Sequence, residues 1–312
     1  RNNSTLILNY GTDQLTINDQ FGSTPQIERI EFSDGVSWDL AAMQAAVTVL
    51  GTSANDILSG LEVADRMYGL AGNDTLVAAS GDDLLDGGIG NDVIYAGAGN
   101  DLLIGGTGND TLYGGQGNDT YQFQKGDGID MVIDSSDTYY GPGGGAADKV
   151  RFLDVRSTEV TALRSYSTLI LNYGTDQLTI NDQFGSTPQI ERIEFSDGVS
   201  WDLAAMQAAV TVLGTSANNS LSGLEVADRM YGLEGNDTLA GAGGDDLLDG
   251  GTGADSIYAG SGNDLLIGGT GNDLLYGGQG NDTYQFQKSD GIDTINDGTD
   301  TYYGPGGGAA DK

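Results

Sequence analysis

The chain has 312 residues, 52 of them glycine, and a formal net charge of −34 at pH 7. This charge argues against nucleic acid as a partner, because nucleic-acid binding needs a basic surface. The chain has no cysteine and no histidine, which excludes a disulfide framework and thiolate chemistry. The longest apolar stretch, residues 40–50, is too short to cross a bilayer, so we expect no transmembrane segment.

The chain is a tandem duplication. Residues 1–149 recur at 164–312 with a constant offset of 163, and 19 of the 149 aligned positions differ. Such near-identity predicts one fold and one role for both copies. The second copy stops at the equivalent of Lys149, so we interpret the chain as a fragment of a longer tandem array with adjacent copies as partners. Residues 301–312 would then begin a further linker.

Residues 1–50 and 138–213 predict small antiparallel β-units, each followed by a short helix. Apolar residues alternate with polar ones in both segments, and turn-forming pairs such as Asn181–Asp182 separate the runs. Asp202 is typical of a helix N-cap and predicts a helix over 203–209. We expect these units to cap or link solenoids, because open coil ends expose strand edges and core.

A nine-residue period runs through residues 51–122 and 214–285, within the expected roll segments 51–137 and 214–300. An Asp recurs in each unit, with Asn219 replacing the first Asp of the second copy, and a large side chain follows two places later, as in GGIGNDVIY (87–95) and GGTGNDTLY (105–113). Six turn-forming residues and three strand-like ones predict a half-coil, so two units make one 18-residue coil with the large side chains inside. The predicted fold is all-β, with parallel β-roll solenoids alternating with small antiparallel β-units and a short helix.

These units resemble the haemolysin-type calcium-binding nonapeptide repeat of RTX proteins, G-G-x-G-x-D-x-U-x. The run IERIEFSDGVSWD (190–202) is similar to the related domain that accompanies such repeats in large bacterial exoproteins. The resemblance implies calcium ions between stacked turns, held by Asp carboxylates and glycine carbonyls. Calcium suits such turns, since it takes six to eight hard oxygen ligands in irregular geometry.

Carried onto this sequence, the resemblance nominates the Asp residues of the better-matched units and glycines of their turns, with about 4–6 calcium ions per copy. The Asp residues are Asp74, Asp83, Asp92, Asp101, Asp110 and Asp119, and Asp237, Asp246, Asp255, Asp264, Asp273 and Asp282. The glycines are Gly88, Gly90, Gly97, Gly99, Gly106, Gly108, Gly115 and Gly117, and Gly251, Gly253, Gly260, Gly262, Gly269, Gly271, Gly278 and Gly280. Asp65 and Asp228 are not nominated, because their units lack the turn glycines.

A further acidic cluster follows the last unit of the first copy and contains Asp127, Asp130 and Asp134. It either holds a terminal calcium ion or forms a solvated acidic turn, and the sequence leaves both readings open. Asp127 and Asp130, with Asp290 and Asp293 in the second copy, are included among the candidate ligands.

The resemblance implies a structural module that stays unfolded inside the cell and folds and stiffens on calcium outside it. Such a module would belong to a long extracellular fibre, adhesin or surface protein. The alternative is a calcium-dependent folding or secretion appendage of a type I-secreted enzyme or toxin. We expect no catalytic activity, because no single carboxylate departs from the repeat pattern. An uncharged strip that includes Tyr95 and Tyr113 leaves lateral self-association open.

Overall fold

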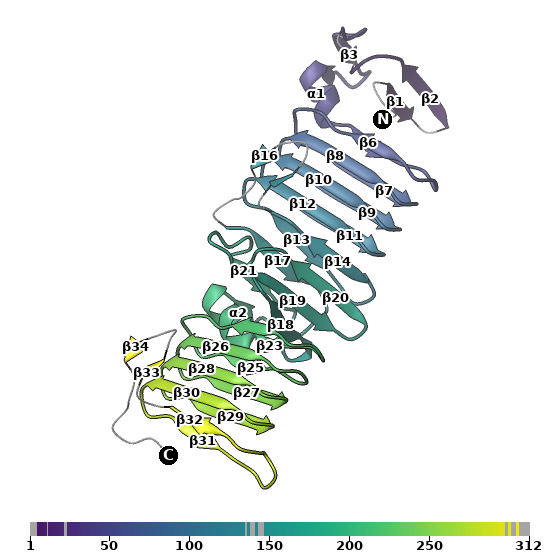
Figure 1. Cartoon of the computed structure of the whole chain (residues 1–312). Coiled ribbons are helices and arrows are strands. Elements are labelled where there is room, and N and C mark those ends of the chain that lie inside the picture. Colours follow the sequence, from purple (N-terminus) through teal and green to yellow (C-terminus); the bar gives the residue numbers. More distant parts are fainter. Residues whose placement is uncertain are drawn as a thin grey trace. The chain divides into compact units, whose positions relative to one another are not determined.

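The structure is a computed structural model of the whole chain. It describes residues 5–10, 12–21, 24–134, 136–137, 141–142, 147–296, 299–300 and 304–305. Two compact units are present, one of residues 1–160, 172–183 and 187–200, the other of residues 161–171, 184–186 and 201–312. Strands dominate both units (Figure 1), which confirms the all-β class.

The first unit contains a roll in which the chain alternates between two parallel sheets. One sheet contains, in spatial order, β6 (Ile57–Ser59), β8 (Thr75–Ser80), β10 (Val93–Ala98), β12 (Thr111–Gln116), β14 (Ile129–Val132) and β20 (Asp176–Ile180). The other contains β5 (Thr48–Leu50), β7 (Arg66–Ala71), β9 (Leu84–Ile89), β11 (Leu102–Thr107), β13 (Thr120–Phe123), β17 (Lys149–Phe152) and β21 (Arg192–Glu194).

The second unit repeats this architecture. One sheet contains β18 (Thr161–Ser165), β23 (Thr211–Leu213), β25 (Arg229–Tyr231), β27 (Leu247–Thr252), β29 (Leu265–Thr270) and β31 (Thr283–Gln285). The other contains β24 (Ser220–Ser222), β26 (Thr238–Gly243), β28 (Ser256–Ser261), β30 (Leu274–Gln279) and β32 (Thr294–Ile295). Two further strands, β19 (Thr168–Tyr173) and β22 (Ser200–Trp201), contain residues of both units.

The strand register confirms two nine-residue units per coil. Within one sheet, Val93 pairs with Thr111 and Ile94 with Leu112, so each strand stacks on the strand 18 residues away. The strands are longer than the three residues that the sequence predicts, because the turn glycines also pair across coils, as Gly97 does in β10. Most inner strands therefore have six residues, and the turns between them are correspondingly short.

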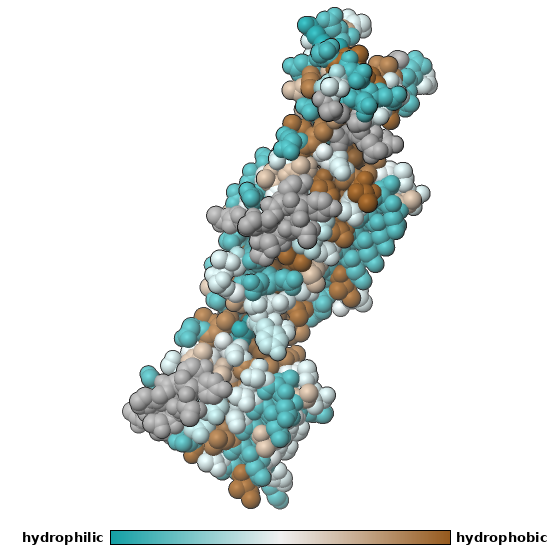
Figure 2. Space-filling model, turned by 45° about the horizontal axis from the view of Figure 1, so that its top comes forward, coloured by the Kyte–Doolittle hydropathy of each residue, from teal (hydrophilic) through white to brown (hydrophobic). Residues whose placement is uncertain are grey.

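The core of each roll is a row of inward-pointing side chains. Leu76, Leu85 and Ile94 are fully buried, and their neighbours along each strand are partly exposed. In the second unit the buried cluster contains Val212, Met230, Leu239, Leu248, Ile257, Ala259, Leu266 and Leu275. In Figure 2 hydrophilic residues cover much of the visible face of the first roll, and hydrophobic ones appear between them. The alternation thus places one large apolar side chain per unit inside.

Several small hairpins pair in the antiparallel sense. These are β1 (Leu6–Tyr10) with β2 (Asp13–Ile17), β3 (Arg29–Glu31) with β4 (Ser37–Asp39), β15 (Ser136–Asp137) with β16 (Gly141–Pro142), and β33 (Thr299–Asp300) with β34 (Gly304–Pro305). Residues 138–213 do not form an antiparallel unit throughout, because β17, β20 and β21 also pair in parallel with strands of the roll or with one another. The roll therefore continues beyond the last nonapeptide.

The helices lie where the capping signals predict them. The second, α2 (Leu203–Ala209), has Asp202 as its N-cap, and the Asp202 carboxylate accepts the Ala205 N–H at 2.9 Å. Its counterpart α1 (Leu40–Ala45) is capped by Asp39 in the same way. Among the described residues, no helix is long and apolar enough to cross a membrane.

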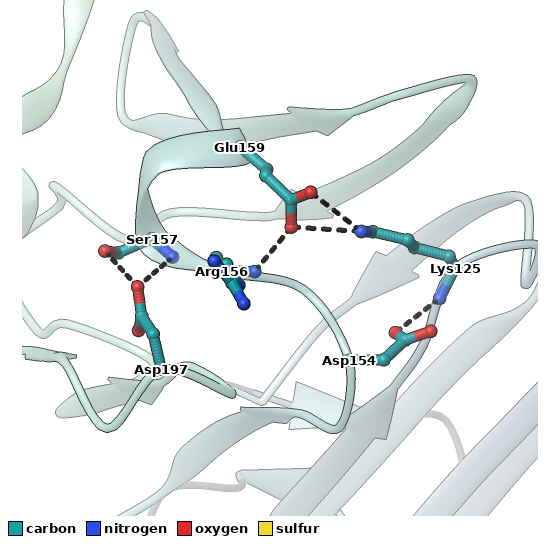
Figure 3. Close-up of polar contacts among 6 residues, drawn as sticks. All are labelled: Lys125, Asp154, Arg156, Ser157, Glu159 and Asp197. Carbon is teal, nitrogen blue, oxygen red and sulfur yellow. Dashed lines mark hydrogen bonds and ion pairs between the residues drawn. The ribbon is translucent and has the colours of Figure 1, made fainter.

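Polar contacts hold the segment after β17 against the last turn of the first roll (Figure 3). Lys125 pairs with Glu159, which lies in a short 3-10 helix (Ser157–Glu159), at 2.9 Å, and the Lys125 N–H donates to Asp154 at 2.9 Å. Ser157 donates from both its N–H and its hydroxyl to Asp197. The ion pair is exposed and contributes little to stability by itself, but these contacts fix the path of the chain beside the roll.

Candidate calcium sites

The Asp residues of the nonapeptides form ladders along the turns of each roll. The Asp74 N–H donates to Asp92 Oδ1 and the Asp92 N–H donates to Asp110 Oδ1, both at 2.7 Å. On the other turns, the Asp101 N–H donates to Asp119 Oδ1 at 2.8 Å. Side chains that the sequence places 18 residues apart are thus brought together, and one oxygen of each carboxylate is fixed by the backbone of the preceding coil.

The second carboxylate oxygen, Oδ2, is buried and accepts no hydrogen bond in eleven of the twelve nominated ladder residues. These are Asp74, Asp83, Asp92, Asp101, Asp110 and Asp119, and Asp237, Asp246, Asp255, Asp264 and Asp273. The twelfth, Asp282, is also buried and accepts the Asp264 N–H. Burying an ionised oxygen without a partner is very costly. The buried carboxylates of the ladders therefore need a cation to neutralise their charge.

The first two turns of each roll are built differently. In the first roll, the Thr52 N–H donates to Asp56 Oδ2 at 2.7 Å and the Leu61 N–H donates to Asp65 Oδ2 at 2.5 Å. The second roll repeats this arrangement. In these turns the backbone N–H of the turn's second residue therefore binds the side-chain oxygen that faces the turn, an oxygen that accepts no hydrogen bond in the later turns.

In the later turns, the second residue of each unit has a positive φ, and its N–H makes no such bond. These residues are Leu70, Ala79, Gly88, Gly97, Gly106 and Gly115, and Leu233, Ala242, Gly251, Gly260, Gly269 and Gly278. For a residue with a side chain, such as Leu70 at φ 79°, this conformation costs about 1–2 kcal/mol. The residues with this strained conformation lie in the turns where a carboxylate oxygen has no hydrogen-bond partner. A bound ion in these turns would offset the cost of the strain.

The glycines let oxygens from neighbouring coils converge. A Cβ atom added to Gly87 would meet Asp92 Oδ2 and, at 2.6 Å, the carbonyl oxygen of Gly105 one coil further on. The fourth-position glycines also have positive φ, and a Cβ on Gly108 would overlap the carbonyl oxygen of Gly90. The remaining nominated glycines of this position are Gly99, Gly117, Gly253, Gly262, Gly271 and Gly280, with the same conformation. Carboxylate and carbonyl oxygens therefore converge between the stacked turns, and calcium prefers oxygen ligands.

Burial raises the pKa of the ladder carboxyls far above their ordinary value of 3.8. The pKa rises to about 8 for Asp101, about 7 for Asp110 and about 6 for Asp92. In each case the backbone N–H of the preceding ladder residue lowers the pKa, and the charge of a neighbouring Asp raises it. A divalent cation between the turns would favour the ionised form and remove this repulsion.

The ladders extend beyond the nonapeptides, which the sequence reasoning missed. The Asp119 N–H donates to Asp148 Oδ1 at 2.7 Å, and the Asp148 N–H donates to Glu191 Oε2 at 2.6 Å. The spacings of 29 and 43 residues break the nine-residue period. One feature could have indicated that Asp148 belongs to the ladder: it directly precedes strand β17, as Asp119 directly precedes β13.

The acidic cluster after the first roll is divided by the fold. The Asp110 N–H donates to Asp130 Oδ1 at 3.0 Å, so Asp130 adds a member to one ladder. Asp127 Oδ2 accepts the Gln124 N–H, and its other oxygen is buried without a partner. Asp134 lies apart from both, with Asp119.

In the second copy the equivalent turn is less enclosed. The Asp273 N–H donates to Asp293 at 3.0 Å, and the Gln287 N–H donates to Asp290. Both carboxylates are only partly buried. The contact pattern of the first copy is therefore kept, without its burial.

The fold and its oxygen-lined turns define a calcium-binding β-roll. The family model of the RTX calcium-binding nonapeptide repeat matches residues 50–85, 86–121, 213–248 and 249–284. The model of the haemolysin-type calcium binding protein related domain matches residues 5–42 and 168–205. The chain belongs to the RTX calcium-binding repeat proteins.

The other comparisons add little. No curated protein matches the chain. Among solved structures, the crystal structure of the extracellular lipase LipA from Serratia marcescens is similar, at 15% sequence identity and a TM-score of 0.18. The match covers 82% of this chain and 34% of the lipase chain, so this chain spans about a third of the length of that protein.

Replacing Asp110 with Asn should remove one or two bound calcium ions. Asn keeps an oxygen that can accept the Asp92 N–H but loses the inner carboxylate oxygen. Because neighbouring turns share ligands, the loss should stay local. Calorimetric counting of bound calcium checks it, with Asp82→Asn, an exposed residue, as the charge-matched control. An unchanged count and affinity in Asp110→Asn would show that this turn holds no ion.

Proposed function

We propose that the chain is a structural module that folds and stiffens when calcium fills its turns outside the cell. The single observation that carries this proposal is the row of buried Asp Oδ2 atoms without hydrogen-bond partners. They need a cation for the roll to be stable at neutral pH, and they recur at every later turn of both rolls. No other cluster of the described residues offers a comparable array of ligands.

The repetition favours a mechanical role over a catalytic one. The Asp residues occupy equivalent positions, coil after coil, and share one hydrogen-bond pattern. A catalytic site needs one carboxylate whose surroundings differ from the rest. A ladder of equal sites instead couples each coil to the next, as in other solenoids. We therefore propose a non-enzymatic part of a longer secreted or surface protein, such as a fibre or adhesin.

The alternative role is a calcium-dependent folding or secretion appendage of a type I-secreted enzyme, and it depends on the same coupling of calcium binding to folding. An appendage would fold and bind calcium as a stalk does. The two roles differ in what adjoins the repeats in the whole protein. The tandem repetition of a 149-residue copy at an offset of 163 favours the stalk.

The calcium concentration that produces folding tests the proposed location. Extracellular calcium modules have dissociation constants of about 10⁻⁴–10⁻³ M, far above the calcium level of the cytosol. A calcium titration of the chain, followed by far-ultraviolet circular dichroism, should have its midpoint in this range. A midpoint at or below about 10⁻⁷ M, typical of cytosolic calcium sensors and buffers, would contradict folding outside the cell.

Lateral association with a second copy of the chain is a further proposal. Tyr95 and Tyr113 stack on one face of the first roll with ring centroids 4.6 Å apart, and Ile57 on the same sheet is 76% exposed. Replacing both tyrosines with Lys should weaken calcium-dependent self-association in sedimentation without changing calcium uptake. The same change at Tyr258 and Tyr276, which stack at 4.8 Å, provides the matched variant. A parent chain that stays monomeric at high concentration would rule the contact out.

A further inference from the structure

We propose that Asp119, Asp134 and Asp148 form a divalent-cation site where the nonapeptides of the first roll end and β17 continues the roll. Only Asp119 belongs to a nonapeptide; Asp134 lies two residues beyond the end of β14, and Asp148 directly precedes β17. The site rests on the proposed function, because it takes the same ion as the repeat turns, but its ligand set lies mostly outside the repeat.

The distances between the three carboxylates fit one ion. One oxygen from each side chain lies within 4.8 Å of the other two. Calcium holds oxygen ligands at 2.3–2.6 Å, so two ligands of the same ion are at most about 5.2 Å apart. All three side chains are buried, with 0% of Asp119 and 1% each of Asp134 and Asp148 exposed. The group is therefore an enclosed site rather than an acidic surface patch.

Two of these carboxylates direct an oxygen without a partner into the site. Asp119 Oδ2 and Asp134 Oδ2 are buried and accept no hydrogen bond. The other oxygen of Asp134 accepts the hydroxyl of the fully buried Tyr121 at 2.6 Å. Tyr121 thereby fixes the orientation of Asp134 and leaves Oδ2 available, as an outer partner does for a metal ligand.

A glycine provides the space for the group. A Cβ atom on Gly114 would collide with the Tyr121 hydroxyl and with Asp119 Oδ2, and it would lie 2.7 Å from Asp134 Oδ1. Three oxygens thus surround a position where no side chain fits. Glu191 adds a further negative charge beside the group, since its carboxylate accepts the Asp148 N–H at 2.6 Å. So much negative charge in a buried space needs a counter-ion.

An ion at this position would join the repeat to the segment that follows it. β13 and β17 already pair in parallel, with Thr120 opposite Lys149, one residue beyond Asp119 and Asp148. The ion would add a bond between these two strand starts and attach the end of β14 through Asp134. Calcium would then stabilise the junction between the nonapeptides and the strands that continue the roll, as well as the turns of the nonapeptides.

Calcium counting on the whole chain tests the site. The Asp134→Asn, Asp148→Asn double variant keeps acceptors for the Tyr121 hydroxyl and the Asp119 N–H but loses two anionic ligands. We expect native mass spectrometry at saturating calcium to show one ion fewer than in the parent chain. The double variant Asp13→Asn, Asp182→Asn removes the same charge from exposed positions and should keep the parent count.

An unchanged count and unchanged affinity in the double variant would overturn the site. If the double variant does not fold in calcium, the single variants decide, because each keeps two of the three carboxylates. Either single variant should bind the last ion at least tenfold more weakly, and parent-like binding in both overturns the proposal. A parent chain that folds without calcium would instead contradict the proposed function, so the two failures are distinguishable.

Discussion

Removing calcium with a chelator at neutral pH should abolish most of the strand signal of the chain. In the first roll, six buried carboxylates would each keep an oxygen without a partner. The effective penalty for such a buried charge is several kcal/mol, so six of them exceed the roughly 5–15 kcal/mol by which folded domains are stable. The core cannot compensate, since each nonapeptide contributes about one large apolar side chain. Far-ultraviolet circular dichroism in excess chelator and after calcium addition measures the change.

The control for this prediction is magnesium at the same concentration. Magnesium demands near-ideal octahedral geometry and gives up its water reluctantly, so it should not restore the strand signal. Protease digestion provides an independent readout, because the calcium-free chain should be cut throughout both rolls. A full β spectrum that persists in chelator at pH 7.5 would contradict the prediction.

Acidification should partly restore structure to the calcium-free chain. Burial raises the pKa of Asp83 to about 7 and of Asp246 to about 8, while the unfolded chain titrates near 3.8. Between about pH 4 and pH 7, the folded roll therefore holds protons that the unfolded chain has released. Unfolding releases these protons, so the free energy of unfolding falls as the pH rises through this window. In chelator, lowering the pH from 7.5 to 5 should increase the strand signal.

Calcium should show the opposite pH dependence. The ion binds the ionised carboxylates, so protons compete with it, and the calcium concentration needed for folding should rise as the pH falls from 7.5 to 5. Circular dichroism titrations at a series of pH values with and without chelator give both trends in one experiment. A calcium-free chain that gains strand signal as the pH rises would contradict the raised pKa values.

The helices and the coil repeat could be predicted from local patterns. The spacing of Asp and of the large residues predicts an 18-residue coil, and the register of β10 with β12 has that spacing. Asp202 marks the start of α2, and the observed helix has the predicted bounds, Leu203–Ala209. Both features depend on neighbouring residues along the chain or on a fixed period, which a single sequence contains.

Features that depend on the stacking of coils could not be predicted. Leu70 and Ala79 occupy turn positions that glycine holds elsewhere, and only the structure shows that they adopt the same left-handed conformation. The two turn types differ in whether the second N–H binds the Asp carboxylate, a distinction of backbone conformation rather than composition. Asp148 and Glu191 join a ladder across 29 and 43 residues, and no sequence period indicates those contacts.

The central claim is that the buried Asp ladders hold calcium between stacked turns. Anomalous diffraction from crystals grown in calcium tests it most directly, because it locates each ion without reference to the protein chemistry. We predict peaks between turns 18 residues apart, with Asp92 Oδ2 and Asp110 Oδ2 about 2.3–2.6 Å from an ion. Peaks found only at exposed carboxylates such as Glu62 and Asp82, with none beside the ladder oxygens, would contradict the claim.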